Sequence, residues 1–192
     1  MTKKIRIEPA QPHHASEIAQ AVMDAVGEEI CVEFAGADHT VEDVKRMFTH
    51  LASMDDAQYS YRNSLVALDD EDNVAGVCVS YDGADLHRMR EHFFNAAEEF
   101  VGKKMRGMAD ETSADEYYLD SLAVNPAYRG YGIGSKLLMA SVEKARAIGK
   151  PAGLLVDLIN PKAEALYRRL GFEYVDDRPF AGVVMHHMQM KY

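Results

Sequence analysis

Residues 125–135 carry the feature that most constrains this chain, three glycines in a short turn between a strand pattern and a helix pattern. The turn reads N-P-A-Y-R-G-Y-G-I-G-S. The β-branched, aromatic and apolar residues 117–124 predict a strand before it, and apolar residues recur at helical spacing after it. Gly130, Gly132 and Gly134 thus place bare N–H groups where a helix begins. Such amides favour phosphate oxygens, although glycines also start helices for packing or turn reasons.

A second segment, N-P-K-A-E-A-L-Y-R-R-L-G-F, begins at Asn160 and predicts a short helix with clear ends. Asn160 suits the N-cap, Pro161 the first helical position and Gly171 the left-handed residue after the last turn. Asn160, Ala163 and Tyr167 recur at the spacing of one helix face. That face therefore presents an amide, a small residue and a phenol.

Together the two segments resemble the GNAT superfamily of acyl-coenzyme A-dependent N-acetyltransferases. The glycine-loop pattern of that family is Gln or Arg, two residues, Gly, one residue, then Gly or Ala, and Arg129, Gly132 and Gly134 meet it. The later pattern, N-x-x-A-x-x-L-Y-x-x-x-G-F, is met in full by Asn160, Ala163, Leu166, Tyr167, Gly171 and Phe172. The resemblance is strong over about residues 117–175 and vague elsewhere.

The resemblance and the order of elements imply an α/β (mixed α+β) fold. We expect a central mixed, mostly antiparallel sheet of about six to seven strands, with helices on both faces. Strands are expected over residues 5–8, 64–68, 74–81, 117–124, 152–157, 173–176 and 183–190, and helices over residues 15–27, 40–51, 133–148 and 160–170. Residues 28–38 are expected to be irregular and acidic. The whole chain, residues 1–192, is expected to form a single N-acetyltransferase domain.

Residues 82–116 depart from the usual order of the family, in which the third strand passes quickly to the fourth. Apolar residues at helical spacing there predict an added amphipathic helix: Leu86, Met89, Phe93, Ala97, Phe100, Val101 and Met105. The stripe indicates packing against an edge of the core or a dimer interface. The alternative is a lid over the acceptor site.

The resemblance also implies which residues hold acetyl-coenzyme A. The backbone of residues 122–124 (Leu122, Ala123 and Val124) would pair with the pantetheine arm, and the Leu122 N–H would polarise the acetyl carbonyl. Amides of the glycine loop would hold the pyrophosphate: Arg129, Gly130, Tyr131, Gly132, Ile133, Gly134 and Ser135. Asn160 would contact the pantetheine, and Ala163 is small enough to let it pass. Tyr167 would protonate the leaving thiolate, because a phenol is neutral at pH 7 and its O–H can donate.

Three carboxylates are candidates for handling the acceptor amine. Asp120 stands two residues before Leu122, so in a regular strand both side chains lie on one face, and Asp120 can take the proton of the ammonium directly or through water. Glu116 is a weaker candidate for the base, and Asp157 is placed to hold the ammonium. Each of these residues also suits a solvated or capping role, and water alone can serve as the base.

The net charge of −10 argues against a nucleic-acid partner and suits a cationic amine. We expect no membrane segment, because no stretch is long enough to span a bilayer and residues 1–9 lack the apolar run of a signal peptide. Cys31 and Cys78 are the two cysteines, and they form neither a disulfide framework nor a metal-ligand pattern. A cytoplasmic protein without a metal is therefore expected.

These observations predict an N-acetyltransferase that moves the acetyl group of acetyl-coenzyme A to a primary amine by direct attack. The acceptor is expected to be a small-molecule or peptide amine, and a homodimer is compatible with the apolar insertion. The alternative from another class is a non-catalytic coenzyme A-binding sensor or partner module of the same fold. The sequence identifies neither the amine nor the length of the acyl chain.

Overall fold

Seven strands form one sheet in the computed structural model, which describes residues 4–192. Their order across the sheet is β1-β2-β3-β4-β5-β7-β6. The strands are β1 (Arg6–Pro9), β2 (Ser64–Leu68), β3 (Val74–Asp82), β4 (Tyr117–Val124), β5 (Ala152–Asp157), β6 (Glu173–Phe180) and β7 (Val183–Met190). Neighbours run antiparallel except β4 and β5, which are parallel. The predicted mixed, mostly antiparallel sheet is thus confirmed. The prediction for residues 1–9, that they lack the apolar run of a signal peptide, begins with residues 1–3, which lie outside the described residues.

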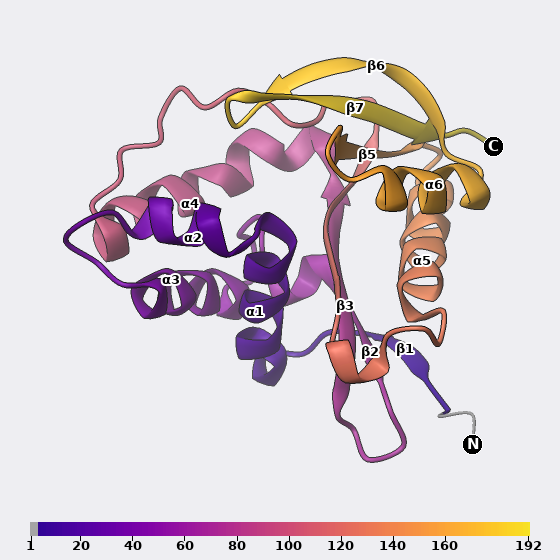
Figure 1. Cartoon of the computed structure of the whole chain (residues 1–192), viewed down its shortest axis with the longest axis horizontal. Helices are drawn as coiled ribbons and strands as arrows, with labels where there is room; N and C mark the ends of the chain where they lie inside the picture. Colours follow the sequence, from indigo (N-terminus) through magenta and orange to yellow (C-terminus); the bar gives the residue numbers. More distant parts are fainter. Residues whose placement is uncertain (1–3) are drawn as a thin grey trace.

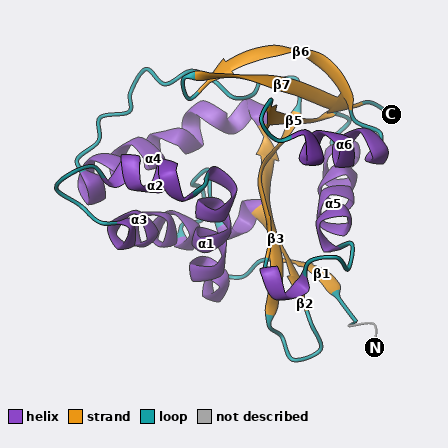
Figure 2. Ribbon diagram, viewed as in Figure 1, coloured by secondary structure: helices purple, strands orange, loops and turns teal. Residues whose placement is uncertain are grey.

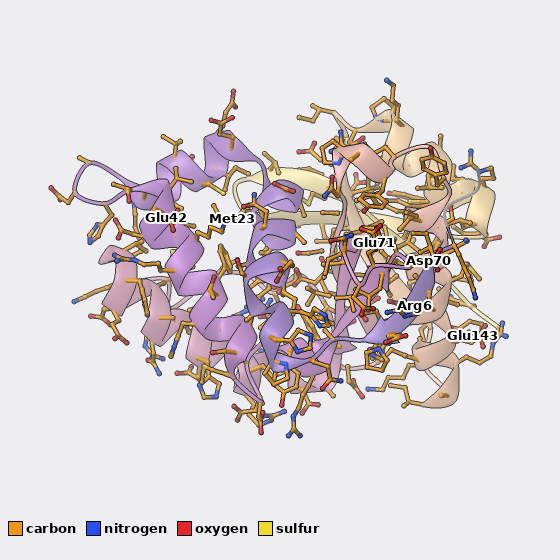
Figure 3. The ribbon with its side chains drawn as sticks, turned by 90° about the horizontal axis from the view of Figure 1, so that it is seen from below. Arg6, Met23, Glu42, Asp70, Glu71 and Glu143 are labelled. Carbon is orange, nitrogen blue, oxygen red and sulfur yellow. The ribbon has the colours of Figure 1, made fainter. Side chains whose placement is uncertain are left out.

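Helices cover both faces of the sheet (Figure 1). They are α1 (Ala15–Val26), α2 (Glu28–Ala35), α3 (Val41–Ser53), α4 (Leu86–Val101), α5 (Ile133–Ala147) and α6 (Pro161–Leu170). Figure 3 places Met23 of α1 and Glu42 of α3 on one side of the sheet, and Glu143 of α5 on the other. Among the described residues, none of the helices has both the length and the apolar character needed to cross a bilayer.

Hydrophobic cores fill both interfaces between helices and sheet. The larger core joins α1, α2, α3 and α4 to β2, β3 and Tyr118 of β4. Two smaller cores lie on the opposite face: one packs α5 and α6 against β4, β5 and β7, and the other packs α5 against β2 and β3. The burial of apolar side chains on both faces is the main favourable contribution to this fold.

The segment expected to be irregular contains α2, so that expectation is wrong. Gly27, at φ 94°, ends α1 and begins α2. Cys31 and Ala35 face the core, while Ile30 and Val32 are half exposed. Apolar residues therefore point both inward and outward, which hides the helical period in the sequence.

The predicted helix in the insertion is confirmed as α4, but it ends at Val101, so Met105 of the predicted stripe lies in the loop that follows. Its apolar stripe is buried against α3 and the larger core, so packing within the chain accounts for it. The loop of residues 102–116 then returns from the far end of α4, past the β6–β7 hairpin, to the start of β4 (Figure 2). Glu116 at its end pairs with Arg178 of β6 at 3.2 Å, which fixes the loop to the hairpin.

Candidate active site

The strands β4 and β5 part soon after they begin. Their ladder joins Tyr117 to Ala152 and Tyr118 to Gly153, and within residues 4–192 the later residues of β4 pair with β3 alone. The backbone N–H and C=O groups on that side of β4 therefore lack strand partners. An extended ligand that carries amides can supply them, as an added strand would.

The glycine loop lies where β4 passes to α5. Gly132 is the N-cap of α5 and has φ 72°, a left-handed conformation that an L side chain adopts only with strain. A Cβ built on Gly130 or Gly132 meets no atom within 4 Å, so the loop borders open space. The Arg129 side chain folds back, and its Nε donates to the Val124 carbonyl at 3.2 Å. Tyr131 is exposed, Ile133 is buried, and Gly134 and Ser135 form the first turn of the helix.

Tyr128 anchors the turn before the glycine loop. Its hydroxyl donates to Asp69 Oδ2 at 2.6 Å, which ties the loop to the β2–β3 hairpin. Hydrogen bonds from Tyr128 and Asn73 lower the pKa of Asp69, so this carboxylate stays ionised and keeps accepting. Arg6 holds the same hairpin from β1 by donating to the Asp69 carbonyl at 2.8 Å, and it lies beside the turn that carries Asp70 and Glu71 (Figure 3).

Helix α6 has the ends that its sequence predicts. The Asn160 Oδ1 accepts from the Ala163 N–H at 3.2 Å, Pro161 begins the helix, and Gly171 follows it at φ 103°. Tyr167 is half buried, and its ring meets Phe172 edge-on at 6.1 Å. Within residues 4–192 its hydroxyl has no hydrogen-bond partner, and burial raises its pKa to about 12. It is therefore a protonated donor at neutral pH that is free to meet a ligand.

The predicted placement of Asp120 and Leu122 on one face is wrong. Leu119 pairs with Ser80 and Ser121 pairs with Val79, so Asp120 is an extra residue that forms a β-bulge. Leu122 packs in the cores beneath α5. Asp120 instead bonds to side chains of the α1–α4 face, because the bulge reverses the alternation of side chains between the two residues.

The Asp120 carboxylate lies on the face of β4 that α1–α4 cover. Its Oδ2 accepts from Tyr81 Oη at 2.8 Å and from Gln58 Nε2 at 3.1 Å, and its Oδ1 accepts from Ser121 Oγ at 2.7 Å. Burial raises the pKa of Asp120, and these three hydrogen bonds act against the rise. A carboxylate with a raised pKa is a stronger base than an exposed one.

Glu116, the weaker candidate for the base, is fully buried in an ion-pair cluster. Its carboxylate accepts from Thr112 at 2.7 Å and from Gln189 at 2.8 Å, and it lies 2.7 Å from His187 Nε2. Burial alone would raise the pKa of Glu116, but the bonds from His187, Gln189 and Thr112 outweigh it and lower the pKa to about 2. A carboxylate with so low a pKa is too weak a base to deprotonate an ammonium. Glu116 is therefore better suited to hold the start of β4 against β6 and β7.

Asp157 takes part in the turn between β5 and α6. Its Oδ1 accepts from the Ile159 N–H at 3.0 Å, and its carbonyl accepts from the Asn160 N–H at 2.9 Å. These bonds position the N-cap of α6, so a structural role accounts for Asp157.

A cavity of about 220 Å³ opens between α1 and the end of β4. Glu17 and Asp24 of α1 line it together with Ala123 and Asn125. Ala123 faces the same core as Tyr118, so the cavity opens on the α1–α4 face. In the described part of the chain, no group of three or more His, Cys, Asp or Glu side chains is arranged to hold a metal ion.

Two residues that sequence reasoning missed, Gln58 and Tyr81, meet at Asp120. They stand 62 and 39 positions before it in the chain, on the loop after α3 and on β3. No local motif marks either residue, and only the pairing of β3 with β4 would have placed Tyr81 near Asp120.

The family model for the acetyltransferase (GNAT) family matches residues 28–172, which is most of the chain and includes both motif helices. This chain belongs to the acetyltransferase (GNAT) family. The resemblance inferred from the two sequence segments is thereby confirmed.

Solved structures and sequence relatives agree with this GNAT assignment. A crystal structure described as an acetyltransferase superposes with a TM-score of 0.77 at 30% identity, covering 97% of this chain and 98% of that one. An N-acetyltransferase from Staphylococcus aureus Mu50 has the same fold, with a TM-score of 0.76 at 24% identity over 96% and 100% of the two chains.

Among sequence relatives, the N-alpha-acetyltransferase RimI of Mycobacterium tuberculosis is 43% identical over 60 residues, 31% of this chain and 37% of that protein. The chain spans less than half the length of the curated relatives it matches.

Proposed function

We propose that this GNAT protein transfers the acetyl group of acetyl-coenzyme A directly to a primary amine. The observation that carries the proposal is the parting of β4 from β5 between two motif helices. The glycine loop lies at the N-terminus of α5 on one side of this gap. Tyr167 of α6 has a hydroxyl without a hydrogen-bond partner among the described residues. When bound, the thioester supplies an activated acetyl group.

Each segment would contribute a separate part of the reaction. Backbone groups at Leu122 and Val124 hold the extended arm of the donor, and the Leu122 N–H stabilises the developing oxyanion. Amides of the glycine loop bind the pyrophosphate with help from the helix dipole. Asn160 and Ala163 border the arm near the thioester. Tyr167 gives its proton to the departing sulfur, so that the donor leaves as a thiol, and the second proton that the nitrogen loses on becoming an amide restores the phenol.

The acceptor must lose a proton before it attacks. A lysine-like amine has a pKa of about 10.4, so well under a thousandth is uncharged at neutral pH. Asp120 would take this proton, because its partly buried carboxylate has a raised pKa and lies on the side of β4 where the cavity beside α1 opens. Holding donor and amine together supplies a further ~7–11 kcal/mol of rate advantage. Peptide and small-molecule amines both remain candidates for the acceptor.

This proposal is tested by measuring the release of free thiol from acetyl-coenzyme A in the presence of each of a panel of peptide, polyamine and amino-sugar amines. We expect turnover with at least one amine class, and calorimetry should show coenzyme A binding that Gly132→Glu abolishes. Leu137→Ile, on the buried side of the same helix, serves as a control for folding. Coenzyme binding without turnover on any amine would favour the non-catalytic sensor or partner module instead.

A further inference from the structure

A chain of buried polar side chains continues inward from Asp120. Tyr81 Oη, which donates to Asp120, also lies 3.0 Å from Glu111 Oε1. Gln58 Nε2 bridges the same two carboxylates, at 2.7 Å from Glu111 and 3.1 Å from Asp120. Two neutral donors therefore connect the candidate base to a second carboxylate that belongs to the insertion.

Arg90 closes this chain on the side away from Asp120. Its guanidinium pairs with Glu111 and, at 2.9 Å, with Asp110. Exposure is 3% for Gln58 and 2% for Tyr81, Glu111 and Arg90, so water does not compete for these contacts. The four residues come from the loop after α3, from β3, from α4 and from the loop that follows α4.

The composition of this cluster is unusual for a packing device. Buried ion pairs contribute little net stability, because the charges lose their hydration, and apolar residues of similar volume often stabilise a fold as well. Asp120 and Glu111 share one phenolic proton, and Glu111 shares the Arg90 guanidinium with Asp110, so three carboxylates stand against one cation and the cluster has an excess of negative charge. That excess lies next to Asp120, which is only partly buried.

We propose that Tyr81 and Gln58 are positioning residues for Asp120, held in place by the Glu111–Arg90 pair of the insertion. The insertion thereby belongs to the acceptor side of the active site as well as to the core. This inference rests on the proposed function, in which Asp120 takes the proton of the acceptor ammonium. Tyr81 and Gln58 fix the direction of the carboxylate, and the distant ion pair fixes them.

Substitutions at Tyr81 and at Glu111 are expected to move the acid limb of the kcat/KM profile in opposite directions. The ionisable groups that interact with Asp120 are the phenols of Tyr59, Tyr81 and Tyr118, the charged pair Glu111 and Arg90, and, from the opposite face of the sheet, the thiol of Cys78. Tyr81→Phe removes a donor to the ionised base, so the acid limb of kcat/KM moves to higher pH. Glu111→Gln removes a negative charge near Asp120 and leaves Arg90 paired with Asp110 alone, so the limb moves to lower pH.

Profiles of kcat/KM against pH for Tyr81→Phe and Glu111→Gln, with the amine that wild type uses, test this inference. We expect kcat to fall about 2- to 10-fold in Tyr81→Phe, the equivalent of one hydrogen bond, with unchanged coenzyme A affinity. Tyr174→Phe and Glu98→Gln, at exposed positions, are the matched controls and should leave the limb in place. Should Glu111→Gln fail to fold, Gln58→Met replaces it. The acid limb of kcat/KM in Gln58→Met should move to higher pH, as in Tyr81→Phe.

Asp120→Asn separates the two proposals. If Asp120→Asn abolishes turnover while the limbs of Tyr81→Phe, Glu111→Gln and Gln58→Met coincide with that of wild type, the positioning inference is wrong and the acetyltransferase proposal stands. If Asp120→Asn turns over like wild type, Asp120 is not the base, and its positioning residues lose their role as well. Movement of the limbs in the expected directions supports both.

Discussion

At the scale of single residues, the proposed chemistry depends most on the hydroxyl of Tyr167. Its ring is held by Phe172 in the core beneath α6, whereas its oxygen has no partner among the described residues. Because burial raises the pKa to about 12, the phenol keeps its proton throughout the neutral range. A residue with a packed ring and a free, protonated oxygen is suited to donate to a leaving group.

We therefore expect Tyr167→Phe to lower kcat by roughly 100- to 10,000-fold, the usual contribution of one proton transfer. Coenzyme A affinity and the thermal midpoint should stay near wild type, because only one oxygen is removed. Steady-state kinetics and calorimetry measure the two effects. Tyr174→Phe, which alters an exposed phenol on β6, is the control, and equal kcat values for both variants would remove the general acid from the mechanism.

Gly153 marks a point of close contact between β5 and the Glu116 cluster. A Cβ built on Gly153 lies 2.0 Å from Glu116 Oε2 and 2.6 Å from its Cδ. We expect Gly153→Ala to lower the free energy of unfolding by about 1–3 kcal/mol, since a buried carboxylate has little room to move. In a Glu116→Ala background the same change should cost much less, and urea unfolding of the four proteins measures the difference. Equal costs in both backgrounds would show that the two residues are not coupled.

At the scale of elements, α4 is a structural helix whose buried face carries both Phe93 of the core and Arg90 of the polar network. Phe93 is buried and stacks with Phe34 at 6.1 Å and with Phe48 at 6.4 Å. We expect Phe93→Ala to lower the free energy of unfolding by about 3–5 kcal/mol, measured by chemical denaturation. Phe94→Ala, at the partly buried neighbour, should cost clearly less. Similar losses at both positions would mean that α4 does not pack through the Phe93 face.

Elements with strong local signals could be predicted from the sequence. Thr40 caps α3 by accepting from the Asp43 N–H at 3.3 Å, and Asn160 caps α6, because caps depend on residues three positions apart. The same holds for the glycine loop, where the conformation of Gly132 is a property of a single residue.

The remaining features depend on contacts between distant residues. The bulge at Asp120 arises from the register of β4 on β3, which no pattern within β4 reveals. The Gln58–Glu111 bond joins residues 53 positions apart, so only the folded chain shows it. Helix α2 was missed for a local reason, since Ile30 and Val32 on its exposed side broke the apolar period.

At the scale of the whole molecule, the Glu116 cluster joins the insertion to the C-terminal hairpin. It connects the start of β4 to Arg178 and Asp176 of β6 through direct bonds and through His187, whose Nδ1 lies 3.0 Å from Asp176 Oδ1. The folded chain lowers the pKa of Glu116 from 4.5 to about 2. A carboxyl with a lowered pKa stabilises the fold above its unfolded pKa, and this contribution is lost as the pH falls through the folded value.

We therefore expect the stability of the folded chain to fall as the pH drops from about 4.5 towards 2. Glu116→Gln should be less stable at neutral pH and should show a flatter dependence on acid, because the titrating group is gone. Urea midpoints at neutral pH and near pH 3 measure both slopes. Parallel slopes for the two proteins would assign the acid sensitivity to other carboxylates.

One surplus residue in β4 also determines which insertions and deletions this domain can accept. Deleting a single position at the bulge would rotate Asp120 towards α5 and leave the polar groups of Tyr81 and Gln58 facing an apolar strand. A deletion of the same size at the exposed residues 106–107 of the loop after α4 would shift no such alternation. The roles proposed for Asp120 and Leu122 thus depend on the number of residues between them. We expect single-residue insertions and deletions near Asp120 to disrupt the fold at positions where substitutions are still tolerated.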